Sequence, residues 1–296
     1  MATDFGRLVT AMVTPFDERL QVNWDRLPEL VDYLIEEQKT DSIVVCGTTG
    51  ESPTLSDEEK VRLYETCVRL ARGRCRILAG TGTYDTEHSI HLTREAERAG
   101  VDGALVVVPY YSRPSQEGLY RHFSAIARST SLPLMLYNIP SRTGVMLEAE
   151  TTLRLAEFPN IVATKESHGD FDHLTRLIKA APAGFRVYSG DDGLTLPFLA
   201  IGAYGVVSVA AHLVGRDIKR MMEAYADGRT AEAAQLHAKL HPVFHGMFFC
   251  PHRVPSPAPV KHALRLKGID VGGVRLPLVP VTEQEAAFIA RLVEQI

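Results

Sequence analysis

Residues 161–169 read Ile-Val-Ala-Thr-Lys-Glu-Ser-His-Gly, and the abrupt end of the apolar run at Thr164 decides how the fold is interpreted. A short continuous apolar run is typical of a parallel strand that is buried on both faces. Lys165 would then lie at the C-terminal end of such a strand, where desolvation lowers the pKa of an amine. Only a neutral amine attacks a carbonyl carbon, so the stretch predicts a Schiff-base nucleophile rather than a solvated lysine that pairs with Glu166.

The same pattern recurs along the chain. Seven other short apolar runs alternate with amphipathic segments of helical period, and one of these segments begins with the capping residues Ser56 and Glu59. The eight expected strands are residues 8–14, 42–46, 76–80, 103–108, 133–137, 161–164, 186–189 and 205–209. Helices are expected at residues 25–37, 57–71, 87–99 and 117–129. Eight such units predict an α/β fold, the closed (β/α)8 or TIM barrel.

The barrel is expected to occupy residues 1–226 and to carry the active site. Residues 227–296 are interpreted as a C-terminal segment of three helices, at 230–248, 259–266 and 283–294, packed outside or beside the barrel. The alternative, a doubly wound open sheet, would bind a nucleotide at a glycine-rich first turn. The first turn here is Thr14-Pro15-Phe16, so the barrel is favoured.

Composition narrows the class of partner. A net charge of -4 argues against nucleic acid or an anionic membrane and leaves small metabolites open. Residues 1–7 lack the basic and apolar regions of a secretory signal, and no apolar stretch approaches a membrane span, so a cytoplasmic protein is expected. The four cysteines form no CxxC pair and are interpreted as reduced thiols; they are Cys46, Cys67, Cys75 and Cys250.

Chemistry in a barrel of this kind lies at the C-terminal ends of the strands. These ends carry many hydroxyl groups and a single amine, that of Lys165, whereas the other lysines, Lys261 among them, fall in helical or loop segments. The turn Gly47-Thr48-Thr49-Gly50 offers backbone N–H groups and two hydroxyls to an anion. It predicts a carboxylate or phosphate site, although a plain strand-to-helix turn would look similar.

Residues 137–144 read Tyr-Asn-Ile-Pro-Ser-Arg-Thr-Gly. A phenol such as that of Tyr137 at the barrel mouth can transfer protons, and Arg142 in the following turn can bind a carboxylate with two parallel hydrogen bonds. An ordinary buried tyrosine followed by a surface arginine is the alternative.

No metal site is predicted. His237, His241 and His245 recur at helical spacing, but Pro242 is expected to interrupt that ladder. Asp191 and Asp192 follow Ser189-Gly190 and are interpreted as N-cap residues rather than as magnesium ligands.

Taken together, these motifs resemble the dihydrodipicolinate synthase / N-acetylneuraminate lyase family of class I, Schiff-base aldolases. The resemblance covers essentially the whole chain. It is carried by residues 47–52, 109–111, 137–144, 165–167 and 189–192, and by Pro257-Ala258-Pro259-Val260-Lys261, in which Ser256 stands where the family usually has Asn. Arg142 points to the synthase branch, because the sialic acid lyases and sugar-acid aldolases usually lack that arginine.

The resemblance implies a role for each residue. Lys165 would form a Schiff base with pyruvate, and Tyr137 would move protons. Thr49 would relay protons between Tyr137 and Tyr111, the latter supplied by a neighbouring subunit. Thr48 and Thr49 would hold the pyruvate carboxylate, and Arg142 the carboxylate of L-aspartate 4-semialdehyde, while Gly190 and Val207 line the pocket. No metal or organic cofactor is implied, and a homotetramer is expected.

Lysine-inhibited members of the family bind lysine at a subunit-interface cleft, and the resemblance places that cleft around Ser52, Pro53, Asp57, Lys60, Tyr84, His88 and Tyr110. Those members usually carry His or Glu at 60, Asn at 84 and Glu at 88. A cationic Lys60 would repel the ammonium groups of lysine, so weak or absent feedback inhibition is predicted.

Three other functions compete with this reading. One is cleavage of a 2-keto-3-deoxy sugar acid, sialic acid or hydroxy-keto acid to pyruvate, which Arg142 argues against. A non-catalytic pyruvate-binding barrel would not need Lys165, Tyr137, Thr49 and Tyr111 together. A phosphate-binding isomerase would need a glycine-rich turn where Asp191 and Asp192 place two carboxylates instead.

Overall fold

The computed structural model describes residues 4–296, and its centre is a closed barrel of eight parallel strands in chain order, β1 to β8. The expectation about a secretory signal falls partly on residues 1–3, which lie outside those described. The strands are Leu8–Ala11, Ser42–Val45, Arg76–Gly80, Gly103–Val107, Leu134–Asn138, Ile161–Glu166, Arg186–Ser189 and Gly205–Ser208. β1 pairs with both β2 and β8, which closes the barrel. The predicted (β/α)8 fold is confirmed.

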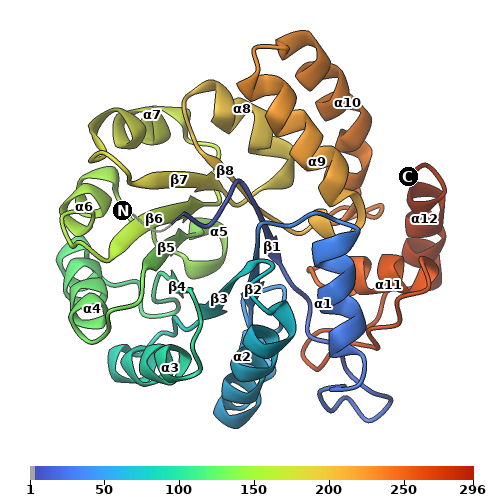
Figure 1. The fold of residues 1–296 in the computed structure, drawn as a ribbon, viewed down its shortest axis with the longest axis horizontal. Helices are drawn as coiled ribbons and strands as arrows, with labels where there is room; N and C mark the ends of the chain where they lie inside the picture. Colours follow the sequence, from blue (N-terminus) through green and yellow to red (C-terminus); the bar gives the residue numbers. More distant parts are fainter. Residues whose placement is uncertain (1–3) are drawn as a thin grey trace.

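Helices surround the barrel and follow the strands in turn (Figure 1). They are α1 (Leu27–Glu36), α2 (Asp57–Ala71), α3 (Thr86–Arg98), α4 (Gln116–Arg128), α5 (Pro140–Thr143), α6 (Ala149–Leu155), α7 (Phe171–Ala180), α8 (Thr195–Ala200) and α9 (Ala211–Ala226), with short 3-10 turns η1 (Ser52–Thr54) and η2 (Asp192–Leu194). The predicted capping box is present, since Ser56 and Glu59 each bond the other's backbone N–H. No helix within residues 4–296 is long and apolar enough to cross a bilayer.

Three more helices follow the barrel: α10 (Thr230–Gly246), α11 (Ala258–Leu266) and α12 (Glu283–Val293). In Figure 1 they lie to one side of the ring, where α10 runs beside α9. The expected interruption at Pro242 is wrong, because α10 continues through that residue and the rings of His241 and His245 stack 6.1 Å apart. The buried side chains of Leu240, Val243 and Phe244 hold this helix in place despite the missing N–H of Pro242.

The barrel interior is filled by apolar side chains to which every strand contributes at least one. They include Val9, Val44, Leu78, Leu105, Met135, Ala163, Tyr188 and Val207, all in one buried cluster that also includes Tyr137. Because side chains alternate along a strand, the residues two positions beyond Met135 and Ala163 also face inward. These residues are Tyr137 and Lys165, at the C-terminal end of the barrel.

Candidate active site

Lys165 and Tyr137 occupy adjacent positions on neighbouring strands. Strand β6 continues two residues beyond the predicted end at Thr164, because Lys165 pairs in register with Tyr137 of β5. The Lys165 Nζ atom lies 4.1 Å from the centre of the Tyr137 ring. Lys165 is only 6% exposed, and its cationic side chain is covered on one side by an aromatic face.

Gly190 makes room for this lysine. A Cβ atom at Gly190 would lie 2.8 Å from Lys165 Cε and would overlap Ser167 Oγ. Only glycine fits here without displacing a neighbour, so the strand end of β7 and the lysine side chain are packed tightly together.

Ser167 was not predicted as a site residue. Its hydroxyl is buried beside Gly190 and has no hydrogen-bond partner within residues 4–296. The only sequence signal was its place two residues beyond Lys165. An unpaired buried hydroxyl this close to the nucleophile is available to a bound molecule.

The Gly47–Gly50 turn is strained and tightly held. The residues on either side, Cys46 and Glu51, both have positive φ angles, 56° and 60°, which cost a non-glycine residue about 1–2 kcal/mol each. Glu51 N–H donates to the Thr48 carbonyl (3.1 Å), and Thr14 Oγ1 donates to the Gly50 carbonyl (2.7 Å). A conformation of this cost persists only where the surroundings enforce it.

A cavity of about 230 Å³ is lined by three of the predicted site residues, Thr48, Tyr137 and Arg142. Its lining also includes Tyr110. Arg142 reaches it from the one-turn helix α5, where its side chain remains exposed to solvent. Lys165, Thr49, Gly190 and Val207 are not among the lining side chains. Lys165 contacts the lining residue Tyr137, Gly190 packs against Lys165, and Val207 belongs to the barrel interior.

Tyr111 is a predicted catalytic residue whose side chain the single chain leaves in solvent. Its side chain is 94% exposed, and its φ angle is +76°. A bulky residue in this region of φ is uncommon and calls for a constraint. The neighbouring Tyr110 faces Tyr84 instead, with ring centres 5.5 Å apart.

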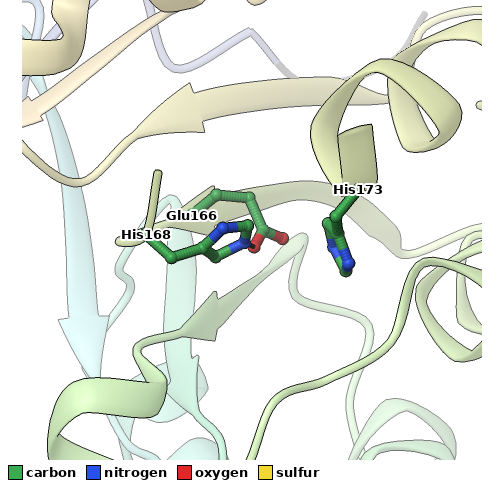
Figure 2. Close-up of side chains that lie close together, drawn as sticks. All are labelled: Glu166, His168 and His173. Carbon is green, nitrogen blue, oxygen red and sulfur yellow. Dashed lines mark hydrogen bonds and ion pairs between the residues drawn. The ribbon is translucent and has the colours of Figure 1, made fainter. Parts of the chain in front are cut away.

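One group of three side chains within residues 4–296 has the spacing of a metal site. Glu166, His168 and His173 place their donor atoms within 4.8 Å of one another (Figure 2). However, His168 Nδ1 accepts a hydrogen bond from the Asp170 N–H, which puts the ring proton on Nε2. Nε2 then donates to Glu166 Oε2 at 2.8 Å, so its lone pair is not free for a metal.

The Glu166 carboxylate is satisfied by further donors. Thr164 Oγ1 donates to Oε1 (2.7 Å), and Asn138 Nδ2 donates to Oε2 (2.8 Å). Burial lowers the pKa of His173, which therefore favours the neutral form. Glu166 and His168 therefore form a buried hydrogen-bonded pair at the end of β6, and His173 of α7 contacts it only through its ring, whose centre lies 4.9 Å from that of His168. No sequence pattern indicated this cluster, because its members lie on a strand, a loop and a helix.

Asp191 and Asp192 have different partners. Asp191 caps the turn η2 by accepting from the Gly193 N–H (2.8 Å). Asp192 is buried and accepts from the Ser208 hydroxyl and from the N–H groups of Val209 and Ala210. Burial raises the pKa of Asp192 to about 6, and its oxygens occupy the donors that a phosphate would use after β8.

Named proteins are similar in sequence to this chain along nearly its whole length. The chain is 54% identical over 291 residues to 4-hydroxy-tetrahydrodipicolinate synthase of Bacillus velezensis, covering 98% of this chain and 99% of that protein. It is 52% identical over 294 residues to the enzyme of the same name from Bacillus subtilis, covering 99% of this chain and all of that one.

Solved structures give the same result. A dihydrodipicolinate synthase of Bacillus anthracis superposes with a TM-score of 0.95 at 48% identity, covering 99% of both chains. The enzyme of Cyanidioschyzon merolae, solved with lysine bound, does so with a TM-score of 0.95 at 42% identity over 98% of both chains. The dihydrodipicolinate synthetase family itself matches residues 4–296. The chain therefore belongs to the dihydrodipicolinate synthetase family.

Proposed function

We propose that this chain is a lyase that condenses pyruvate with L-aspartate 4-semialdehyde to give 4-hydroxy-tetrahydrodipicolinate, a step in lysine and diaminopimelate synthesis. Its relatives at 54% and 52% identity carry the name of that enzyme. The observation that carries the proposal is the buried Lys165 amine in contact with Tyr137, whose ring lines the cavity below Arg142.

Lys165 starts the reaction by attacking C2 of pyruvate. The carbinolamine loses water to form an iminium, which then loses a proton from C3 to become an enamine. The enamine carbon attacks the aldehyde of the second substrate, which regenerates the iminium. The amino group of that substrate then adds to C2 and displaces the Lys165 amine, which closes the ring and releases the product. Tyr137 moves the protons of these steps, and the 4.1 Å between the Lys165 amine and the centre of its ring supports this role. The iminium is the electron sink, so the proposal includes no metal or organic cofactor.

The two carboxylates bind at different places. The turn of Thr48 and Thr49 holds the carboxylate of pyruvate, and Arg142 holds that of L-aspartate 4-semialdehyde. Thr48 and Arg142 both line the cavity, which supports simultaneous binding of the two substrates. Gly190 and Val207 complete the substrate pocket around Lys165.

The proton relay requires a second copy of the chain. Thr49 passes protons from Tyr137 to Tyr111 of the partner subunit. The exposed, left-handed Tyr111, with the exposed Tyr84 nearby on the Tyr110 ring, supports burial of this face in an assembly. We infer a homotetramer built as a dimer of dimers, active in the cytoplasm on small molecules rather than on nucleic acid or membranes. The active site belongs to the barrel, residues 1–226, with residues 227–296 as its helical extension.

Feedback inhibition by lysine should be weak. Asp57 is the acidic group of the expected cleft, and it is already engaged by His88 Nε2 (2.8 Å) and by Lys60 Nζ (3.5 Å). A lysine ligand would have to displace both, and Lys60 would repel its ammonium groups. Turnover is expected to persist at millimolar lysine, and strong suppression at that concentration would refute this part of the proposal.

Borohydride reduction in the presence of pyruvate, followed by peptide mass mapping, tests the mechanism. A pyruvyl adduct on Lys165 is expected. An adduct on another lysine, or no adduct, contradicts the proposal. A parallel assay with 2-keto-3-deoxy sugar acids, sialic acid and hydroxy-keto acids distinguishes the synthase from a pyruvate-releasing aldolase.

A further inference from the structure

A buried ion pair joins the C-terminal segment to the turn that carries Thr48 and Thr49. Lys261 of α11 directs Nζ to Glu51 Oε1 at 2.7 Å, and both side chains are almost fully enclosed, at 2% and 0% exposure. The same Nζ donates to the Gly273 carbonyl (2.7 Å) and lies 4.1 Å from the centre of the Phe16 ring. Burial lowers the pKa of Lys261 to about 8 against the opposing effect of Glu51, so the amine is mainly charged at neutral pH.

The second oxygen of Glu51 is also held by the C-terminal segment. The Arg275 N–H donates to Glu51 Oε2 at 2.9 Å. The Arg275 guanidinium binds both oxygens of Glu59 (2.7 and 2.6 Å) and the Thr54 carbonyl (2.8 Å). Lys261 and Arg275 of the C-terminal segment therefore hold the chain on both sides of η1.

Glu51 is the link between these contacts and the substrate site. Its backbone is in the strained left-handed conformation, and its N–H donates to the carbonyl of Thr48. A carboxylate held at both oxygens cannot rotate, so it fixes the backbone that orients the two threonines. A buried ion pair adds little to stability over well-packed apolar side chains, so stability alone does not account for this arrangement.

We propose that Lys261 is a positioning residue for the reaction: through Glu51, the C-terminal helical segment sets the geometry of the turn that binds the substrate carboxylate. The inference rests on the proposed function, in which Thr48 and Thr49 hold the carboxylate of pyruvate. Lys261 itself touches no substrate. Its loss should weaken the recognition of the carboxylate and leave the amine of Lys165 reactive.

The test compares pyruvate with its methyl ester, which lacks the anionic carboxylate. Lys261→Met keeps the length of the side chain and removes the charge. The concentration of pyruvate needed for half-maximal borohydride trapping should rise about tenfold, and that of the ester should change by less than about twofold. In steady state the KM for pyruvate should rise more than the KM for the aldehyde. A purely structural role would affect both ketones and both KM values alike.

Two further variants separate positioning from folding. Glu51→Gln/Lys261→Met leaves no unpaired buried charge, so its unfolding midpoint should recover while the pyruvate requirement stays high. This variant carries the test if the single substitution does not fold. Lys219→Met removes another lysine that forms an ion pair, with Asp41 at 2.5 Å on the far side of the barrel, and should leave both ketones unaffected.

Each result has a distinct meaning. Parent-like pyruvate dependence in a folded Lys261→Met or double variant contradicts the positioning role, as does an equal loss for pyruvate and the ester. A parent protein that traps no pyruvate contradicts the proposed function first, and the positioning role with it.

Discussion

Lys165 and Tyr137 are register partners on adjacent strands, and the lysine amine lies 4.1 Å from the centre of the tyrosine ring. The relationship is set by the backbone, because the β5–β6 ladder places both Cα atoms side by side and the strand alternation turns both side chains inward. Because the two residues are paired in the sheet, the tyrosine ring is held beside the amine. The proposed proton transfer to and from that amine requires such a position.

Tyr137→Phe tests the phenol directly. Phenylalanine keeps the aromatic face over Lys165 and removes only the hydroxyl, so the fold should be unchanged. The turnover number should fall by about 10²–10⁴, the usual contribution of a positioned acid or base. Steady-state kinetics measure this. Tyr188→Phe is the matched control, because its hydroxyl donates to the Gly6 carbonyl at 2.9 Å within the same interior cluster. It should cost about 1 kcal/mol of stability and little activity. Equal kinetic losses in the two variants would contradict the assignment.

Gly190→Ala should block formation of the Schiff base. The added methyl would overlap Ser167 Oγ and press on Lys165 Cε, and overpacking of this kind costs about 1–3 kcal/mol. The rate of borohydride trapping should fall severely. Ser167→Ala/Gly190→Ala removes the closest atom in the way and should recover part of that rate. If the single variant traps pyruvate as fast as the parent, the contact is not as tight as described.

Arg142→Ala should separate the two half-reactions. The variant should still trap pyruvate on Lys165, because the proposed site of the pyruvate carboxylate is the Gly47–Gly50 turn and not Arg142. It should lose about ten- to a hundredfold or more in kcat/KM for L-aspartate 4-semialdehyde, the value of a lost hydrogen bond to a charged group or a pair of them. Arg113→Ala controls for a lost exposed cation, because Arg113 packs on the neighbouring Gly144. Loss of trapping in Arg142→Ala would show that the two carboxylate sites are not independent.

His212 should contribute to acid sensitivity. It is buried, its Nε2 accepts from the Val13 N–H (3.2 Å), and its Nδ1 bonds the Val209 carbonyl (2.8 Å). Burial lowers its pKa from 6.5 to about 4. Below pH 6.5 His212 binds a proton in the unfolded chain but stays neutral in the folded chain. Its contribution to the free energy of unfolding is therefore fully present above pH 6.5 and is lost as the pH falls towards 4. The full loss is about 3 kcal/mol.

Denaturant unfolding between pH 4 and 7 measures this loss. His212→Gln keeps an acceptor and a donor but does not titrate, so its free energy of unfolding should fall less over that range than that of the parent. The exposed His241→Gln removes a histidine without this environment and should retain the slope of the parent. Identical slopes in all three proteins would rule out His212 as the source.

The barrel could be predicted from sequence because strands buried on both faces are read as uninterrupted apolar runs. The candidate site residues were proposed from their places at the ends of those runs, and from the family resemblance. Strand ends were less predictable: Lys165 and Glu166 interrupt the apolar pattern, yet both remain in β6 because the partner strand continues to pair with them. Pro242 failed as a helix breaker because tertiary packing outweighs one missing hydrogen bond.

Contacts between distant segments were not predictable. Lys261 stood out only as part of the motif 257–261, and nothing in its neighbourhood reveals a carboxylate partner 210 residues away. The hydrogen bond between His168 and Glu166 depends equally on how a loop folds back on a strand. Hydrophobic periodicity predicts which face of a helix or strand is buried, but not which residues that face contacts.

The separation of Glu51 and Lys261 along the chain also affects when their ion pair can form during synthesis. Glu51 leaves the ribosome 210 residues before its partner, and domains begin to fold from the N-terminus during synthesis. A nascent barrel can therefore contain the proposed substrate-binding turn before Lys261 is available to form the ion pair with Glu51. On the proposed positioning role, a protein truncated before α11 would retain Lys165 but would lack the contacts of Lys261 and Arg275 that hold Glu51.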